Sequence, residues 1–170
     1  MEHRVFIALG TNLGDREENL RKALACLESF VHLLACSGVY ETPPWGFTDQ
    51  PWFLNMAVEG DTSLSPADLL TRLKQLEKDL GREPGFRFGP RLIDLDILFY
   101  DNLILKTAEL EIPHPRLEER SFVLAPLADL APDFQHPVTG RTVLQMLKEV
   151  DTSAIRYFGS LDCTGEIATG

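Results

Sequence analysis

Two aspartates separated by one residue are the strongest chemical signal in the sequence. Asp94 and Asp96 lie in the otherwise apolar run Arg91-Leu-Ile-Asp-Leu-Asp-Ile-Leu-Phe-Tyr100. In a β-strand alternate side chains point to the same face, so the two carboxylates are predicted to lie side by side. A hard cation such as Mg²⁺, which prefers oxygen ligands and commonly brings phosphates, would relieve their mutual repulsion. The alternative is a solvated pair of carboxylates on an open sheet face.

Arginines are placed on both sides of this run and could bind phosphate. They are Arg82, Arg87, Arg91, Arg116 and Arg120. Guanidinium groups pair bidentately with phosphate oxygens and stay charged at any working pH. The segment between Arg82 and Arg91 is rich in Gly and Pro, so it could close over a triphosphate and carry its arginines inward. Taken singly, each arginine could equally be an exposed residue that pairs with one of the many carboxylates.

A second group of residues could hold a flat heterocycle. Asn55 stands in an otherwise apolar strand, and its amide can pair both a donor and an acceptor with the edge of a ring. Phe53 lies two residues earlier, hence on the same face, where it could stack on that ring, and Phe122 is another candidate for stacking. A core phenylalanine beside a hydrogen-bonded core asparagine explains the strand equally well.

His114 lies between Pro113 and Pro115, which hold the backbone in an extended or turn conformation. It could donate a hydrogen bond to a phosphate or simply cap a turn. Other catalytic motifs are absent from the sequence: Gly10 and Gly14 are not followed by the Lys and Ser/Thr of a phosphate loop. There is also no Gly-x-Ser-x-Gly elbow and no Cys/His cluster for zinc.

The elements that must position these residues follow from the spacing of apolar residues. Strands are predicted over 5–9, 39–42, 53–59 and 94–100, and helices over 16–34 and 66–80. Asp15 with Glu18 and Ser65 with Pro66 mark the two helix starts, and Gly81 marks the end of the second helix. The side of the last strand opposite to the aspartates, comprising Ile93, Leu95, Ile97 and Phe99, is predicted to face the core.

The resulting order β-α-β-β-α-β is that of an α+β ferredoxin-like sandwich. A C-terminal extension of short elements follows, including a helix over 143–150 that is capped by Thr142 with Gln145. We expect one domain over residues 1–160 and a frayed tail over 161–170.

Composition limits the classes of function. The 170 residues carry 16 Lys and Arg against 26 Asp and Glu, a net charge of −10, which argues against a nucleic-acid-binding surface. No segment has the length of a membrane span or the pattern of a signal peptide. Three cysteines without metal-ligand spacing suit a reducing compartment, so a cytoplasmic protein is expected, with no membrane partner. No long apolar surface stripe demands a partner, so a monomer is expected.

The run Arg87-Phe-Gly-Pro-Arg-Leu-Ile-Asp-Leu-Asp-Ile-Leu98 resembles the signature of the 6-hydroxymethyl-7,8-dihydropterin pyrophosphokinase family. Further similar segments cover the chain from about Val5 to Pro132, in the order in which the family has them. They include Ala8-Leu-Gly-Thr-Asn-Leu-Gly14, Tyr40-Glu-Thr-Pro-Pro44, Gln50-Pro-Trp-Phe-Leu-Asn55 and Pro113-His-Pro-Arg-Leu-Glu-Glu-Arg120-Ser-Phe122.

The resemblance implies transfer of pyrophosphate from ATP to the pterin hydroxymethyl group in folate biosynthesis, with AMP as the other product. It implies that Asp94 and Asp96 bind two Mg²⁺ ions and act in catalysis together with Arg82 and Arg91 on the closing loop. The pterin would be held by Thr42, Pro44, Phe53, Asn55 and Phe122. ATP would lie along Glu77, Arg82, Arg87, Arg91, His114 and Arg120.

One departure from the family concerns Phe88, where many members have Trp. Phe88 keeps the aromatic ring but lacks the indole N–H, so the loop could seat differently when it closes. Two other classes of function also compete with the family assignment. A haloacid-dehalogenase-type phosphatase also has an Asp-x-Asp pair, but it needs alternating strands and helices that are not predicted here. A noncatalytic RNA-binding sandwich would need surface aromatics and a basic sheet, and the sequence shows neither.

Overall fold

The computed structural model describes residues 2–44, 49–81 and 92–163, and every statement below concerns these residues. The helices are α1 (Arg16–Leu27), α2 (Pro66–Asp79), α3 (Ser121–Leu130), α4 (Val143–Lys148) and the short 3-10 helix η1 (Leu117–Glu119). The strands are β1 (His3–Thr11), β2 (His32–Cys36), β3 (Gly38–Thr42), β4 (Phe53–Thr62), β5 (Asp94–Tyr100), β6 (Leu105–Lys106), β7 (Glu111–Ile112) and β8 (Arg156–Ser160). Within the described ranges, no helix combines the length and apolar character needed to cross a membrane.

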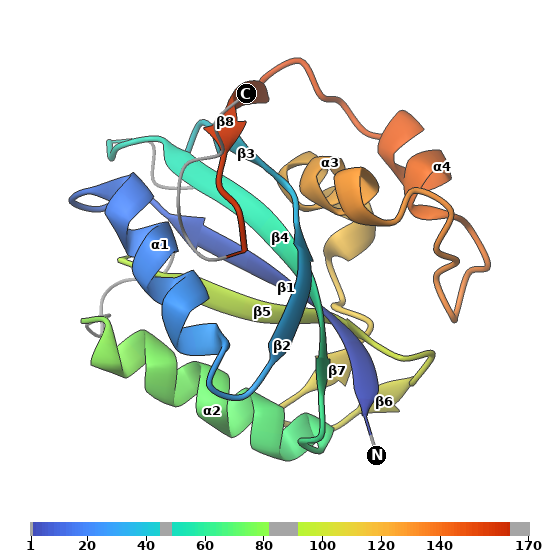
Figure 1. The fold of residues 1–170 in the computed structure, drawn as a ribbon. Coiled ribbons are helices and arrows are strands. Elements are labelled where there is room, and N and C mark those ends of the chain that lie inside the picture. Colours follow the sequence, from blue (N-terminus) through green and yellow to red (C-terminus); the bar gives the residue numbers. More distant parts are fainter. Residues whose placement is uncertain (1, 45–48, 82–91, 164–170) are drawn as a thin grey trace.

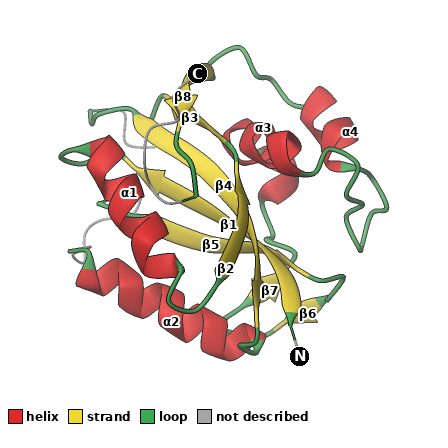
Figure 2. Cartoon of the chain, in the orientation of Figure 1, coloured by secondary structure: helices red, strands yellow, loops and turns green. Residues whose placement is uncertain are grey.

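The main sheet is antiparallel and separates two layers of helices. Its strand order is β5-β1-β4-β3-β8, and β2 pairs with β4 as well. Helices α1 and α2 lie on one face and α3 and α4 on the other, as Figures 1 and 2 show. The predicted α+β class is therefore confirmed, and the antiparallel pairing is unlike the parallel sheet that alternating strands and helices would form.

The predicted helix over 16–34 is wrong at its C-terminal end. It begins as expected, with the Asp15 side chain accepting a hydrogen bond from the backbone N–H of Glu18, but it ends at Leu27. The chain then turns and forms β2, which pairs with β4. Val31 continues the apolar spacing and is buried, whereas Leu34 is 43% exposed. Pairing with β4 stabilises residues 32–36 as a strand, although the apolar spacing of this segment would also fit a continuation of α1.

The remaining predicted elements are confirmed with small changes at their ends. Strand β4 is three residues longer than the predicted strand over 53–59, and β5 has the predicted bounds. The Ser65 side chain accepts a hydrogen bond from Asp68 N–H at the start of α2. Gly81 follows that helix with φ of 95°, the left-handed conformation for which glycine is favoured. Thr142 and Gln145 form the predicted capping box of α4.

An irregularity in β5 corrects the predicted core face of this strand. Ile97 pairs with Ile7 and Phe99 with Phe6, so Leu98 is an extra residue between two pairs. Such a bulge shifts the alternation of side chains by one position. Ile93, Leu95 and Ile97 therefore face α1 and α2 as predicted, whereas Phe99 packs with Leu98 in the apolar cluster under α3 and α4.

Gly60 allows β4 to pack closely against the start of β2, with which it pairs. This contact gives a first prediction. A Cβ atom at this position would lie 2.6 Å from Val31 Cγ1 and 2.7 Å from the His32 carbonyl oxygen. We expect Gly60→Ala to lower the free energy of unfolding by about 2 kcal/mol, because backbone cannot move aside as a side chain can. Urea denaturation measures this change.

Gly159 in β8 provides the matched control for this substitution. A Cβ atom there would have no atom within 4 Å, so Gly159→Ala should leave the unfolding midpoint unchanged or slightly higher. Equal midpoints for the two alanine variants would contradict the packing argument.

The C-terminal part of the described chain completes the sheet. Strand β8 pairs with β3, and Leu161 after it is buried. Cys163 also packs against the main core, with its sulfur 2.9 Å from that of Cys36. Most of the tail predicted over 161–170 lies outside the described residues, so the domain boundary at 160 stays a prediction.

Candidate functional site

Asp94 and Asp96 lie on the same face of β5, as the alternation predicts. Their partners on β1 are Gly10 and Ala8, whose small size leaves room above the sheet. Both carboxylates are half-buried and line a cavity of about 660 Å³ on the side of the sheet that carries α3. The sheet therefore fixes the spacing of the two carboxylates, and the cavity gives them a volume large enough for a ligand.

The cavity draws its lining from segments far apart in the sequence. The strands β1, β3, β4 and β5 form its floor, η1 and the start of α3 form one side, and the segment before β8 forms another. Its side-chain lining includes Thr42, Pro43, Phe53, Asn55, Asp94, Asp96, Arg116, Glu119, Arg120, Phe122, Asp151 and Ile155.

Asn55 and Phe53 lie on the cavity face of β4, next to Gly10 of the neighbouring strand. The Asn55 amide nitrogen donates to Thr42 Oγ1 at 2.9 Å, and only 8% of Asn55 is exposed. A Cβ atom on Gly10 would lie 3.0 Å from Asn55 Oδ1 and 3.9 Å from a Phe53 ring carbon, so the glycine leaves space for both side chains. Thr42 thus fixes the amide while its oxygen stays directed toward the cavity side of the sheet. This arrangement suits recognition of a ring by hydrogen bonding and stacking.

Arg120 directly precedes α3, and Phe122 is the second residue of that helix. The Arg120 guanidinium lies 5.6 Å from the centre of the Phe122 ring. Burial lowers the pKa of Arg120, and the charge of Asp96 opposes that shift. The structure thus brings Arg120 and Phe122 to the same cavity as the two aspartates, although the aspartates precede them in the sequence by more than twenty residues.

His114 lies beside this group without lining the cavity itself. Its backbone N–H donates to the Leu98 carbonyl oxygen at 3.1 Å, and its Nδ1 accepts from the Arg116 N–H at 3.3 Å. Burial lowers the pKa of His114, while the charge of Asp96 acts in the opposite direction. A neutral ring whose Nδ1 accepts a hydrogen bond carries its proton on Nε2, which leaves that N–H as a donor.

Glu77 occupies a different position from the other predicted residues. It lies on α2, is 2% exposed, and accepts a hydrogen bond from the Leu95 N–H at 2.8 Å through Oε2. Lys74 Nζ lies 3.4 Å from its other carboxylate oxygen. Glu77 therefore holds the edge of β5 between the two aspartates and does not belong to the cavity lining.

Several predicted site residues are not placed in the cavity. Pro44 is described but does not line it, and its neighbour Pro43 does. Arg82, Arg87, Phe88 and Arg91 lie outside the described residues. Two further residues line the cavity: Arg116, one of the arginines predicted as possible phosphate ligands, and Ile155, for which no role was predicted. Ile155 reaches the cavity because β8 pairs with β3.

The donor set fits a divalent cation that arrives with a polyphosphate. Within the described ranges, no group of three His, Cys, Asp or Glu side chains could hold a metal ion by itself. Mg²⁺ commonly takes one or two protein carboxylates, with water and substrate phosphates completing its shell. Asp94 and Asp96 supply that number of carboxylates in a cavity with room for the phosphates.

Comparison with known proteins gives a consistent family. Residues 6–132 match the family model described as 7,8-dihydro-6-hydroxymethylpterin-pyrophosphokinase (HPPK). The chain is 48% identical over 141 residues to the 2-amino-4-hydroxy-6-hydroxymethyldihydropteridine pyrophosphokinase of Bacillus subtilis, covering 82% of this chain and 84% of that protein. It is 46% identical over 142 residues to the folic acid synthesis protein FOL1 of Dictyostelium discoideum, covering 84% of this chain and 22% of that protein.

The chain spans 22% to 25% of the length of three longer relatives, from Dictyostelium discoideum, Pisum sativum and Arabidopsis thaliana. The fold is also found in a crystal structure of Plasmodium falciparum HPPK-DHPS with pterin and p-hydroxybenzoate. That similarity has a TM-score of 0.76 at 17% identity and covers 99% of this chain and 47% of the other.

Proposed function

The chain belongs to the 7,8-dihydro-6-hydroxymethylpterin-pyrophosphokinase family, and we propose that it transfers pyrophosphate from ATP to the hydroxymethyl group of 6-hydroxymethyl-7,8-dihydropterin. The products are AMP and the pterin diphosphate, and the reaction belongs to folate biosynthesis. One observation carries the proposal beyond the family match: a single cavity joins a pair of carboxylates to a ring-binding amide and two aromatic side chains.

The pterin site consists of Asn55, Phe53, Phe122 and Thr42, which line the cavity, and the family resemblance adds Pro44, next to the lining residue Pro43. The Asn55 amide recognises the polar edge of the pterin, and the two phenylalanines hold its faces. The hydrogen bond from Asn55 to Thr42 supports this role because it fixes the amide before the ligand arrives.

The ATP site lies along Asp94, Asp96, His114 and Arg120 and extends to Glu77, Arg82, Arg87 and Arg91. Asp94 and Asp96 would hold two Mg²⁺ ions, which when bound would neutralise charge on the triphosphate. Arg82 and Arg91 are the arginines that stabilise the transferring group. The neutral His114 offers its Nε2–H to a phosphate oxygen. Glu77 keeps the backbone of β5 in place and so maintains the position of the two aspartates.

The reaction is an in-line displacement that depends on positioning. The pterin hydroxyl oxygen bonds to the β-phosphorus, and the bond from that phosphorus to the oxygen bridging to the α-phosphorus breaks. AMP leaves with the electron pair of that bond, and the hydroxyl proton is released. Asn55 and the phenylalanines orient the hydroxyl, while the arginines hold the phosphates in line with it.

We also assign the core to the ferredoxin-like class. The four predicted strands are β1, β3, β4 and β5, and their order in the sheet is β5-β1-β4-β3. In chain order the fourth of them lies beside the first, the first beside the third, and the third beside the second, which supports this assignment. Helices α3 and α4 then form a layer added to the basic sandwich. The cytoplasmic location and the monomeric state remain predictions from the sequence.

Product analysis tests the proposed reaction. Incubation with ATP, Mg²⁺ and 6-hydroxymethyl-7,8-dihydropterin should yield AMP and pterin diphosphate in equal amounts, measured by anion-exchange chromatography. Omission of Mg²⁺ should stop product formation. ADP or free phosphate as the nucleotide-side product would refute pyrophosphate transfer.

A further inference from the structure

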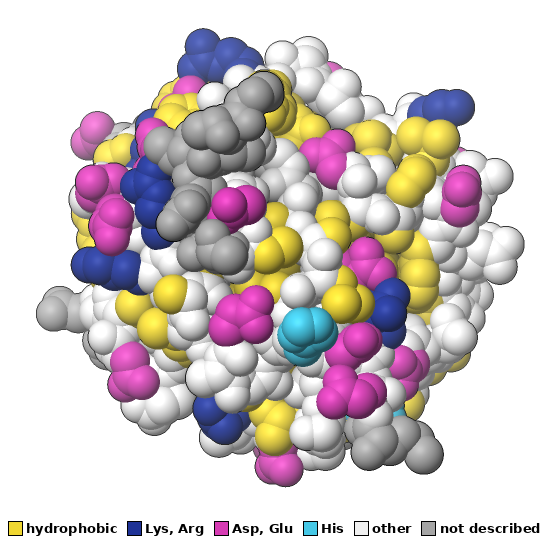
Figure 3. Space-filling view, viewed as in Figure 1, with side chains coloured by type: hydrophobic (Ala, Val, Ile, Leu, Met, Phe, Trp, Pro, Cys, Tyr) yellow, Lys and Arg dark blue, Asp and Glu magenta, His cyan; other side chains and the backbone are white. Residues whose placement is uncertain are grey.

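The arginines of this protein differ in whether a carboxylate pairs with them. The chain has a net charge of −10, and Figure 3 shows acidic side chains scattered over one face of the molecule. Most described arginines form ion pairs with such residues: Arg4, Arg16, Arg21, Arg141 and Arg156. Arg72 has no ion pair with a described carboxylate either, but its guanidinium lies 4.5 Å from the centre of the Phe30 ring and does not line the cavity. Arg116 and Arg120 form no ion pair with any carboxylate in the described part of the chain. Both of these arginines line the cavity.

The position of Arg116 is fixed by its backbone. It directly precedes η1, and its N–H donates to His114 Nδ1 at 3.3 Å. Its side chain is half-buried in the cavity lining, where its charge acts on both His114 and Arg120. Glu119 and Asp151 also line the cavity, but both are exposed to water. Two guanidinium groups that line one cavity, without a carboxylate partner among the described residues, offer their N–H donors to an anionic ligand.

The proposed reaction determines which anion stays in this cavity. The β- and γ-phosphates belong to ATP before the transfer and to the pterin diphosphate after it. They must therefore lie in the space shared by the ring site at Asn55 and the carboxylates at Asp94 and Asp96. Arg116 lines that same space. AMP, in contrast, leaves with the α-phosphate.

We propose that Arg116 binds the β- and γ-phosphates, in ATP and again in the pterin diphosphate, as a partner of Arg120. This assignment rests on the proposed pyrophosphokinase function and adds a phosphate-binding residue to those that the family resemblance implies. Arg116 binds the two phosphates that move and takes no part in recognising adenosine or the pterin ring.

Binding measurements on Arg116→Gln test this role with four ligands: ATP, AMP, the pterin diphosphate and the pterin alcohol. We expect affinity for ATP and for the pterin diphosphate to fall roughly tenfold or more, as loss of a charge-assisted hydrogen bond predicts. Affinity for AMP and for the pterin alcohol should stay within about twofold, because neither ligand carries the two phosphates. Arg116→Lys should fall between wild type and Arg116→Gln, since lysine keeps the charge and loses the bidentate geometry. Isothermal titration calorimetry gives all four dissociation constants.

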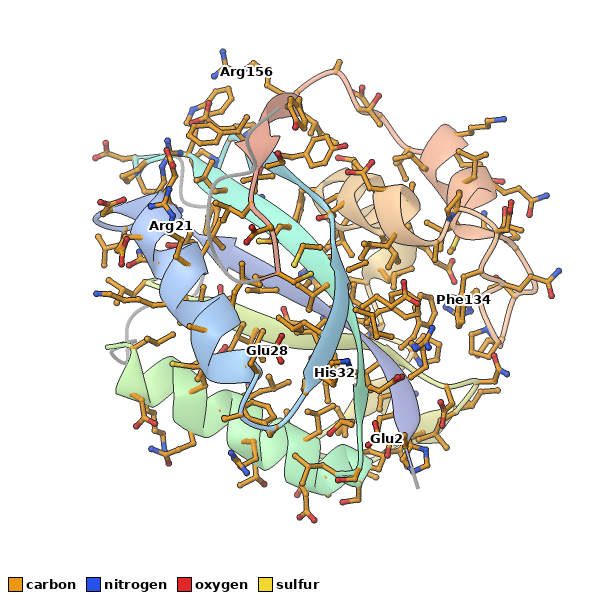
Figure 4. The ribbon with its side chains drawn as sticks, in the orientation of Figure 1. Glu2, Arg21, Glu28, His32, Phe134 and Arg156 are labelled. Atoms are coloured by element: carbon orange, nitrogen blue, oxygen red, sulfur yellow. The ribbon has the colours of Figure 1, made fainter. Side chains whose placement is uncertain are left out.

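Arg21→Gln on α1 is the matched control. It removes the same charge from a side chain that pairs with Glu17 and Glu18, lies on α1 (labelled in Figure 4) and does not line the cavity. If Arg116→Gln binds ATP and the pterin diphosphate as Arg21→Gln does, the assignment is wrong. An equal loss for AMP would also refute it, because the guanidinium would then act on the α-phosphate. Failure of the proposed function itself would look different, since the wild-type protein would then not bind the pterin alcohol or form AMP.

Discussion

Asp96→Ala should reduce turnover by about 10³-fold or more while leaving the melting temperature within a few degrees of wild type. The large loss is expected because Asp96 is one of the two β5 carboxylates in the cavity that we propose to hold cations against the triphosphate. The small change in stability is expected because the substitution also removes repulsion between Asp94 and Asp96, which share one face of β5. Steady-state formation of AMP and a thermal melt measure the two quantities.

Asp68→Asn provides the control for a lost negative charge. Asp68 is exposed on the first turn of α2 and does not line the cavity. Its substitution should leave turnover near the wild-type value. A large loss of stability in Asp96→Ala, with activity preserved, would instead mean that the aspartate pair is structural.

Asn55→Leu should lower kcat/KM for the pterin by about 10²-fold or more, because a site built to hydrogen-bond a ring loses its polar partner. Leucine has nearly the same size, so β4 should keep its place in the sheet. Thr42→Val should have a smaller effect of the same kind, since it removes the hydroxyl that holds the amide at 2.9 Å. KM for ATP should change little in either variant.

Two comparisons make the Asn55 experiment specific. Thr62→Val removes another buried hydroxyl, at the far end of the same strand, where Thr62 donates to the Phe30 carbonyl oxygen. It should leave pterin kinetics unchanged. Thr42→Val should also have no further effect once Asn55 has been replaced, because Thr42 acts through the amide. Additive losses in the double variant would contradict this positioning role.

Local patterns were sufficient to predict the elements that carry the site. Strand β5 has the predicted bounds because its apolar and acidic residues alternate clearly. Helix α2 starts at the predicted cap because Ser65 and Pro66 leave few other conformations for the chain. That Asn55 and Phe122 meet the two aspartates in one cavity was predictable only from the family resemblance, since no spacing rule joins strands so far apart.

Other features depend on pairing between distant segments and could not be predicted. Leu34 fits the helical spacing of α1, but its neighbours Leu33 and Ala35 pair with β4, so this segment forms a strand. The bulge at Leu98, which turns Phe99 to the opposite face, exists because β5 must match the register of β1. Ile155 reaches the cavity because the next residue, Arg156, pairs with Glu41 when β8 joins β3.

The outer edge of β5 has a consequence for self-association. An edge strand normally offers unpaired N–H and C=O groups to which a strand of another molecule can add. Here the Leu95 N–H is bound by the buried Glu77 carboxylate, and the Leu98 carbonyl by the His114 N–H. An added strand would have to break both hydrogen bonds, and the buried Glu77 carboxylate would then lose the Leu95 N–H as a donor. The strand that carries Asp94 and Asp96 is thereby protected from intermolecular sheet growth along its outer edge.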